Sequence, residues 1–126
     1  MDEIWKRLQR VKRLNLRSSE GVGAADVRIE AAPNRLIFHE RGSWETGIAF
    51  SNIYRWTRQE DGVSLEHMRQ GKAVLLFYFI HGSSSPHHCG KDCYTASLAV
   101  NAAGILLSWQ VKGPNKDAWG EYLYTE

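Results

Sequence analysis

The residues best suited to chemistry lie between positions 81 and 93. His87, Cys89 and Asp92 bring an imidazole, a thiol and a carboxylate close together, and these are ligand types that zinc-like sites use in threes or fours. In an extended segment His87 and Cys89 point to one side, so a third ligand would come from another strand, such as His39 or His67. No Cys-x-x-Cys pair is present, so we expect no dedicated metal site. Metal or haem binding stays an alternative, and the sequence identifies no cofactor.

The same cluster has a second interpretation, which is nucleophilic catalysis by Cys89. A reactive cysteine needs a lowered pKa and a base within hydrogen-bond reach. His87 would be that base and Asp92 the group that orients it. Glu40 would add an acid or base, because burial raises the pKa of a carboxyl group. A small enzyme is therefore an alternative function, although side chains so close in sequence diverge and seldom form a working dyad.

Three polar residues lie on strand faces that are otherwise apolar. They are Glu40, Asn52 and Asp92, each in phase with aromatic or aliphatic neighbours. If these faces point inward, the three side chains are buried and need hydrogen-bond partners. An internal structural network is one interpretation. The other is a small-molecule site, which usually combines an apolar cavity with a few convergent polar groups.

Aromatic residues complete the predicted site. The chain has five tryptophans, five tyrosines and four phenylalanines, and Trp and Tyr combine a large apolar face with a polar tip. A small domain so rich in them has either a tightly packed β-core or a lined pocket. The predicted ligand-binding residues are Glu40, Asn52, Tyr54, Trp56, His87, Asp92, Tyr94 and Trp109.

The elements that position these residues are predicted to be β-strands, because apolar residues mostly alternate along the chain. Helical spacing of Ile4, Leu8 and Val11 predicts a short helix over residues 3–10. Later strands are expected over residues 23–31, 35–42, 48–56, 63–68, 72–80, 92–101, 104–112 and 118–125, with a long loop over 81–91. Short turns between them favour an all-β fold, a single antiparallel up-and-down barrel of about eight to ten strands spanning residues 1–126.

Three sequence stretches carry a family resemblance. They are Glu40-x-Gly42 leading to Tyr54-Arg55-Trp56, then His87-x-Cys89-Gly90-x-Asp92-x-Tyr94, then Trp109-x-Val111-x-Gly113-Pro114-x-Lys116-Asp117. From about residue 38 onward the chain resembles a bacterial family of small lipocalin-like, calycin-type proteins of unknown function. The resemblance implies a closed barrel with an internal cavity and no established reaction. The Gly-x-Trp start expected on the first strand is absent here, since Ile4-Trp5 has no such glycine.

Charge and composition limit the classes of partner that the protein is expected to bind. The net charge of +2 does not predict nucleic-acid binding. The longest apolar run, residues 73–80, is too short for a membrane helix. We see no targeting segment and only two cysteines, so we expect reduced thiols in the cytoplasm. The expected partner is a small, partly apolar molecule, and a homodimer is an alternative that the sequence leaves open. Another class, a protein-interaction module, would use the basic segment of residues 1–17.

Overall fold

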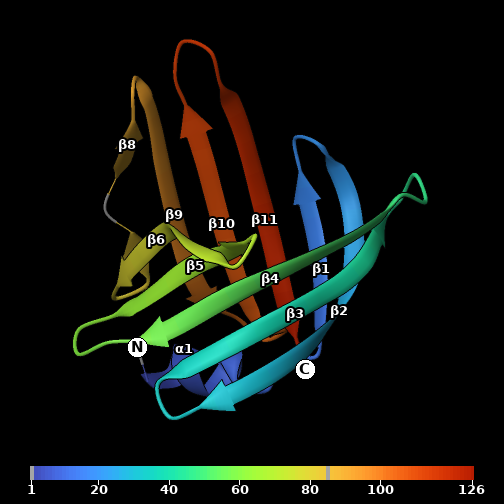
Figure 1. The fold of residues 1–126 in the computed structure, drawn as a ribbon, viewed down its shortest axis with the longest axis vertical. Coiled ribbons are helices and arrows are strands. Elements are labelled where there is room, and N and C mark those ends of the chain that lie inside the picture. The colour runs from blue at the N-terminus through green and yellow to red at the C-terminus, as the bar shows by residue number, and fades with distance from the viewer. Residues whose placement is uncertain (1, 85) are drawn as a thin grey trace.

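The structure, a computed structural model, describes residues 2–84 and 86–126, and of residues 87–89 the backbone alone. One helix, α1 (Asp2–Leu8), precedes the strands (Figure 1). The strands are β1 (Arg13–Ser18), β2 (Gly21–Ala32), β3 (Arg35–Trp44), β4 (Ala49–Arg58), β5 (Val63–Arg69), β6 (Lys72–Ile80), β7 (Ser83–Ser84), β8 (His87–Cys89), β9 (Asp92–Val100), β10 (Ile105–Lys112) and β11 (Asp117–Thr125).

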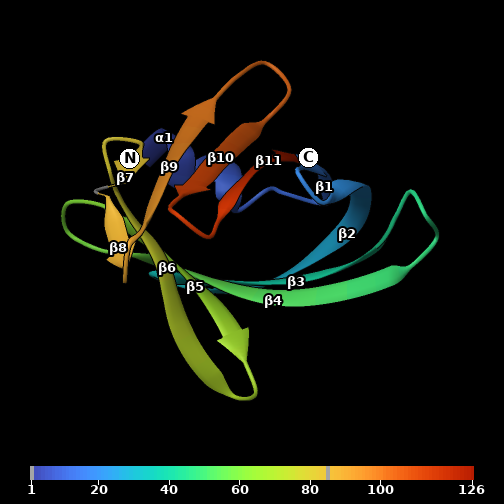
Figure 2. The same cartoon turned by 90° about the horizontal axis from the view of Figure 1, so that it is seen from above.

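The strands form a closed antiparallel barrel, as the sequence predicted. Strands β1 to β6 pair in chain order, β9 pairs with β10 and β10 with β11, and β11 returns to β1. Ten strands make up the ring. The remaining strand, β8, pairs with β9 and lies beside the ring. Figure 2 shows the barrel from above, with the β3–β4 and β5–β6 hairpins extending beyond the wall. No helix in the described part of the chain is long and apolar enough to cross a membrane.

The wall closes between β6 and β9 through the short strand β7. Phe79 pairs with Ser84, and Ser83 pairs in turn with Ser97. The Ser84 hydroxyl accepts a hydrogen bond of 2.9 Å from the backbone N–H of Ala96. The expected loop over residues 81–91 is therefore wrong in part, since it contains β7 and β8. Strands of two and three residues are too short to show an alternating pattern.

Helix α1 lies across one end of the barrel (Figure 1), and apolar side chains fill that end. Trp5 and Leu8 of α1 are buried there, and the helix lies against β9 and β10. Inside the barrel, Trp56 is fully buried between the rings of Phe38 and Phe79, at 5.9 and 6.4 Å between ring centroids. The helix predicted over residues 3–10 forms over Asp2–Leu8 and closes this end.

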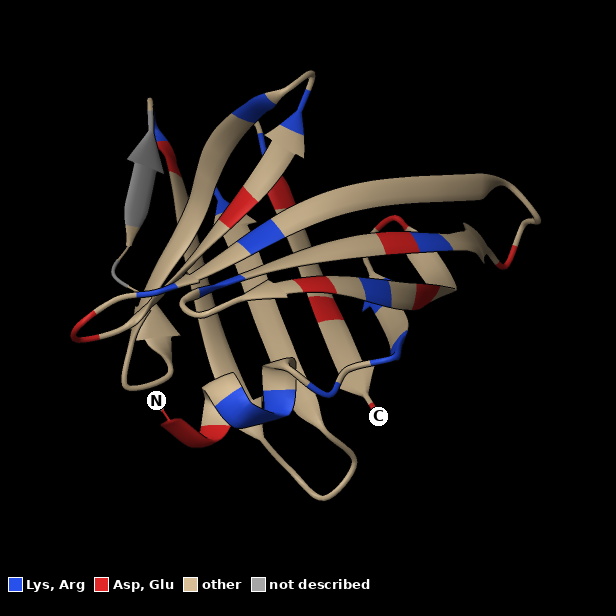
Figure 3. Ribbon diagram, turned by 60° about the horizontal axis from the view of Figure 1, so that its bottom comes forward, with Lys and Arg blue, Asp and Glu red and all other residues tan. Residues whose placement is uncertain are grey.

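The basic segment at the start of the chain pairs with acidic residues of the barrel itself. Arg10 contacts Glu126 at 2.7 Å, and Arg17 contacts Glu121 at 3.0 Å. Figure 3 shows basic and acidic residues interspersed along the strands. Such exposed pairs contribute little stability.

The helix is expected to be part of the barrel core. Leu8 is 0% exposed, so Leu8→Ala should lower the free energy of unfolding by about 2–5 kcal/mol, because it removes buried methyl groups and leaves a cavity. The exposed neighbour Lys6 provides the control, and Lys6→Ala should change it by less than about 0.5 kcal/mol. Urea unfolding measures both. Equal, small effects would show that α1 does not close the barrel.

Candidate functional site

A cavity of about 410 Å³ occupies the half of the barrel away from α1. Its lining includes residues at strand ends distant from the helix, among them Ser18, Trp44 and Arg69. Aromatic side chains dominate the wall and come from six strands: Trp44, Tyr54, Phe77, Tyr94, Trp109, Tyr122 and Tyr124. Polar groups are fewer: Ser18, Glu20, Asn52, His67 and Arg69. The barrel interior is thus filled at one end and hollow at the other.

Strand alternation explains why these side chains face inward. Along β4, Asn52 and Tyr54 line the cavity, whereas Ile53 lies 39% exposed on the outer face. Antiparallel pairing then sets Tyr54 opposite His67 on β5. Their rings stack at 4.8 Å between centroids, with an angle of 24° between the planes.

Glu40 is the buried charge-bearing group of the interior. It is 2% exposed, and β3–β4 pairing sets it opposite Asn52. The hydroxyl of Tyr124, a cavity-lining residue, donates a hydrogen bond of 2.7 Å to Glu40 Oε2. Burial raises the pKa of Glu40 to about 8, and the Tyr124 hydrogen bond opposes this only in part. Glu40 is therefore a neutral carboxylic acid at neutral pH.

The second oxygen of Glu40 is unusual. Oε1 is buried and has no hydrogen-bond partner among the described side chains. A neutral carboxyl has one O–H donor, and an unmatched buried polar atom costs about 1–3 kcal/mol. Oε1 is therefore a buried polar atom whose hydrogen-bonding capacity the described side chains leave unused.

Above Glu40, three aromatic side chains share a hydrogen-bond network. Tyr54 is hydrogen-bonded to Tyr122, which also receives a hydrogen bond from Trp109. Burial is the main cause that raises the pKa of Tyr54 and of Tyr122, and Glu40, ionised at the high pH where phenols titrate, adds to it. Both phenols stay protonated at neutral pH, so they act as neutral hydrogen-bonding groups.

His67 and Arg69 form the polar side of the cavity on β5. Arg69 Nε donates a hydrogen bond of 3.0 Å to His67 Nδ1. Burial, and then the positive charge of Arg69, lowers the pKa of His67. The imidazole is therefore neutral at pH 7. Since Nδ1 accepts, the proton lies on Nε2.

The structure brings together part of the predicted site. Asn52, Tyr54, Tyr94 and Trp109 line one cavity, and Glu40 is linked to that cavity through Tyr124.

Trp56, also expected to contact ligand, lies among the side chains of the filled half and does not line the cavity. It has the expected inward direction but is too far along β4 toward α1.

The predicted cluster of Asp92 with His87 and Cys89 lies at the rim. Asp92 packs against Gly113, where an added Cβ would come within 1.8 Å of Asp92 Oδ1, and it does not line the cavity. The side chains of His87 and Cys89 are outside the described residues. Backbone pairing sets His87 opposite Tyr94 and Cys89 opposite Asp92. Among the side chains that are described, no group of three His, Cys, Asp or Glu is arranged to hold a metal ion.

Sequence reasoning missed several cavity residues: His67 as a ligand contact, Arg69, Tyr122 and Tyr124. The signal was present, because His67 and Arg69 follow Val63 and Leu65 at every second position of β5. The same alternation connects Tyr122 and Tyr124 on β11.

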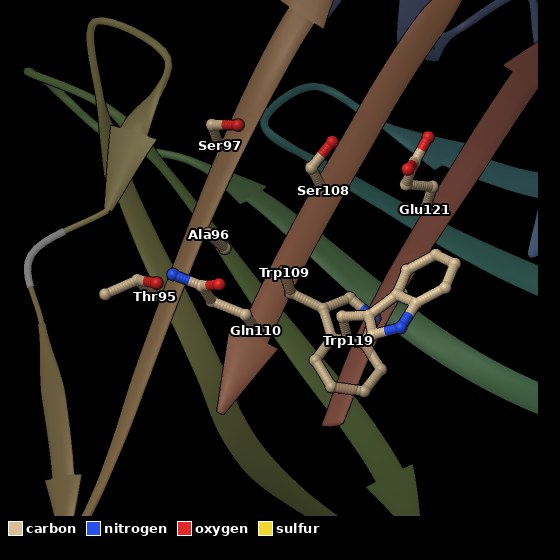
Figure 4. A pocket seen from close by; sticks show the side chains of 9 residues that line it. Thr95, Ala96, Ser97, Ser108, Trp109, Gln110, Trp119 and Glu121 are labelled. Carbon is tan, nitrogen blue, oxygen red and sulfur yellow. The ribbon is translucent and has the colours of Figure 1, made fainter. Parts of the chain in front are cut away.

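A second depression, of about 460 Å³, lies on the outer face of β9, β10 and β11 (Figure 4). Its polar lining is Thr95, Ser97, Ser108, Gln110 and Glu121. Trp119 flanks it and is 40% exposed, with the guanidinium of Arg17 5.7 Å from its ring centroid. Glu121 pairs with Arg17. This depression offers hydrogen-bonding groups, but its one carboxylate is already paired.

These features define a closed antiparallel β-barrel with one filled end and one hollow, aromatic-lined end. The chain belongs to a family of unknown function, DUF6314, whose model matches residues 4–126. No curated protein matches the chain. Among solved structures, a redesigned β-barrel, mFAP1, bound to DFHBI, is similar at 10% sequence identity. The similarity covers 96% of this chain and 97% of that chain, with a TM-score of 0.48.

The neutral state of Glu40 predicts a pH-dependent stability. Folded Glu40 keeps its proton up to about pH 8, whereas the unfolded group loses it near its ordinary pKa of 4.5. The folded state therefore binds more protons between these values, and stability is highest below pH 4.5 and falls as pH rises toward 8. The slope from this group is about 1.4 kcal/mol per pH unit. Glu40→Gln, measured by urea unfolding at pH 5.5 and 7.5, should remove that slope.

The exposed Glu60, in the β4–β5 turn, gives the control, because Glu60→Gln should keep the slope of the natural protein. A Glu40→Gln protein with the same slope as the natural protein would show that Glu40 is ionised inside the barrel.

Proposed function

We propose that the barrel binds a small, partly apolar ligand in the cavity at its open end. The observation that carries this is the cavity itself, about 410 Å³ of space bounded mainly by aromatic side chains. A concave apolar site with few polar groups is the usual form of a small-molecule site. Burial of apolar ligand surface there would contribute roughly 25 cal/mol per Å².

The packing of the wall keeps this space open. Trp109 lies beside Gly120 of β11, where an added Cβ would come within 2.4 Å of the indole nitrogen. Glycine therefore lets the indole lie flat along the wall. At the other end of the barrel, comparable aromatic rings fill the interior completely. The difference supports a cavity that is built to receive a ligand.

The polar groups would orient the ligand. Glu40 Oε1 has no partner among the described residues, and the acid form of Glu40 offers a hydrogen-bond donor. Asn52, across from Glu40, supplies an amide that both donates and accepts. Asn52 would hold the deep end of a flat molecule, with Glu40 acting on it through Tyr124, while Tyr54 and Trp109 contact its faces.

General acid catalysis by Glu40 is the alternative from a different class. One observation favours it, because a pKa of about 8 keeps the group protonated at neutral pH and suited to proton donation. However, Glu40 meets the cavity through Tyr124 and is not among the residues that line it. Ligand binding is therefore the function that the geometry supports best.

Blocking the cavity should abolish binding of a neutral aromatic probe, N-phenyl-1-naphthylamine. In Asn52→Trp the indole would occupy the space beside Tyr54, so we expect at least a tenfold weaker binding by fluorescence titration. Ile53→Trp, one residue away on the outer face, is the matched control and should bind as the natural protein does. Thermal melts establish that both variants fold.

Two results would contradict the proposal. One is an absence of probe binding by the natural protein, and the other is equal binding by the two tryptophan variants.

A further inference from the structure

We propose that the mouth of the cavity binds the anionic group of an organic anion, with Arg69 as the residue that pairs with it. The ligand class is an apolar, preferably aromatic, body that carries a carboxylate or sulfonate. This inference rests on the proposed function, because the apolar body would occupy the cavity described above.

Arg69 has a charge without a partner. It is an exposed residue at the end of β5 that lines the cavity, and no carboxylate among the described side chains forms a salt bridge with it. Arg55 shows the contrast. It pairs with Glu66 on the outer face through two bonds, of 2.8 and 3.0 Å.

Arg69 is nevertheless held in place. Its Nε donates to His67 Nδ1 at 3.0 Å, and the His67 ring is stacked on Tyr54. The hydrogen bond occupies Nε and leaves the two terminal nitrogens, which form the fork that binds a carboxylate through paired hydrogen bonds. An oriented, unpaired guanidinium at a cavity mouth is therefore preorganised for an anion.

The field of Arg69 reaches into the cavity. Its charge lowers the pKa of His67 and favours the ionised form of Tyr54. His67 is neutral, so it adds an Nε2–H donor and does not compete as a cation. Donor groups thus outnumber acceptors on this side of the cavity, which favours a ligand rich in acceptors.

Other charges at the rim are consistent with an anion. Lys116 Nζ donates a hydrogen bond of 3.1 Å to the hydroxyl of Tyr94, a lining residue, and lies 5.8 Å from its ring centroid. Glu20 is the carboxylate in the lining, and its charge acts on Tyr122. Among the charged residues that line the cavity, Arg69 is the cation and Glu20 the carboxylate, and Lys116 lies against the lining residue Tyr94.

Two probes separate this inference from the proposed function. 8-Anilinonaphthalene-1-sulfonate and N-phenyl-1-naphthylamine share their aromatic rings and differ by the sulfonate. We expect the natural protein to bind the sulfonate probe about tenfold more tightly than the neutral one. Arg69→Gln should weaken sulfonate binding about tenfold and change neutral binding less than twofold.

Arg35→Gln is the matched control, because it removes an exposed positive charge at the start of β3, far from the cavity lining. It should leave both affinities unchanged. Titration at two ionic strengths adds a second readout, since the sulfonate advantage should shrink in salt only while Arg69 is present.

The outcomes are distinguishable. The anion site is wrong if the neutral probe binds as tightly as the sulfonate probe, or if Arg69→Gln and Arg35→Gln have the same affinities. In either case the proposed binding of an apolar ligand in the cavity is unaffected. If Arg69→Gln lowers the affinity for both probes equally, Arg69 contributes to the shape of the cavity and does not pair with the anionic group. If neither probe binds, the proposed function itself fails.

Discussion

The interior of the barrel depends on one hydrogen bond between two buried side chains. Tyr124 donates to Glu40 at 2.7 Å, and burial holds that carboxyl in its neutral form. A carboxylate at this position would be strongly destabilising, since an isolated ion away from water is costly. Protonation makes the group tolerable and at the same time supplies a hydrogen-bond donor.

The Glu40–Tyr124 pair lies at the boundary between two differently packed halves. Toward α1, rings such as those of Trp56 and Phe79 fill the barrel. Away from α1, the barrel encloses the cavity. There, hydrogen bonds link the side chains of Tyr54, Tyr122 and Trp109 to one another. The first half supplies stability, and it allows the second half to stay hollow. A chain of 126 residues can therefore contain a cavity in one half, because the packed side chains of the other half stabilise the fold.

Alternation of apolar residues was sufficient to predict the strands, the antiparallel barrel and the inward direction of Glu40, Asn52 and Tyr54. The position of a side chain along the barrel axis was not predictable. Alternation along a strand shows which residues face inward, but not which end of the barrel they occupy. Trp56 illustrates this, since it faces inward but is buried in the filled half. Pairing between distant strands was also hidden, so the contact of Tyr124 on β11 with Glu40 on β3 could not be read from spacing. Short strands such as β7 show no period at all.

Glu40 should be a neutral acid beside the cavity at the open end of the barrel. Carbon-13 NMR of the glutamate side-chain carboxyls, with Glu40 assigned by Glu40→Gln, tests it most directly. We predict that the Glu40 signal titrates near pH 8, apart from the other glutamates, and shifts to higher pH when a neutral aromatic probe excludes water from the cavity. Titration of Glu40 together with the exposed glutamates, unaffected by the probe, would contradict it.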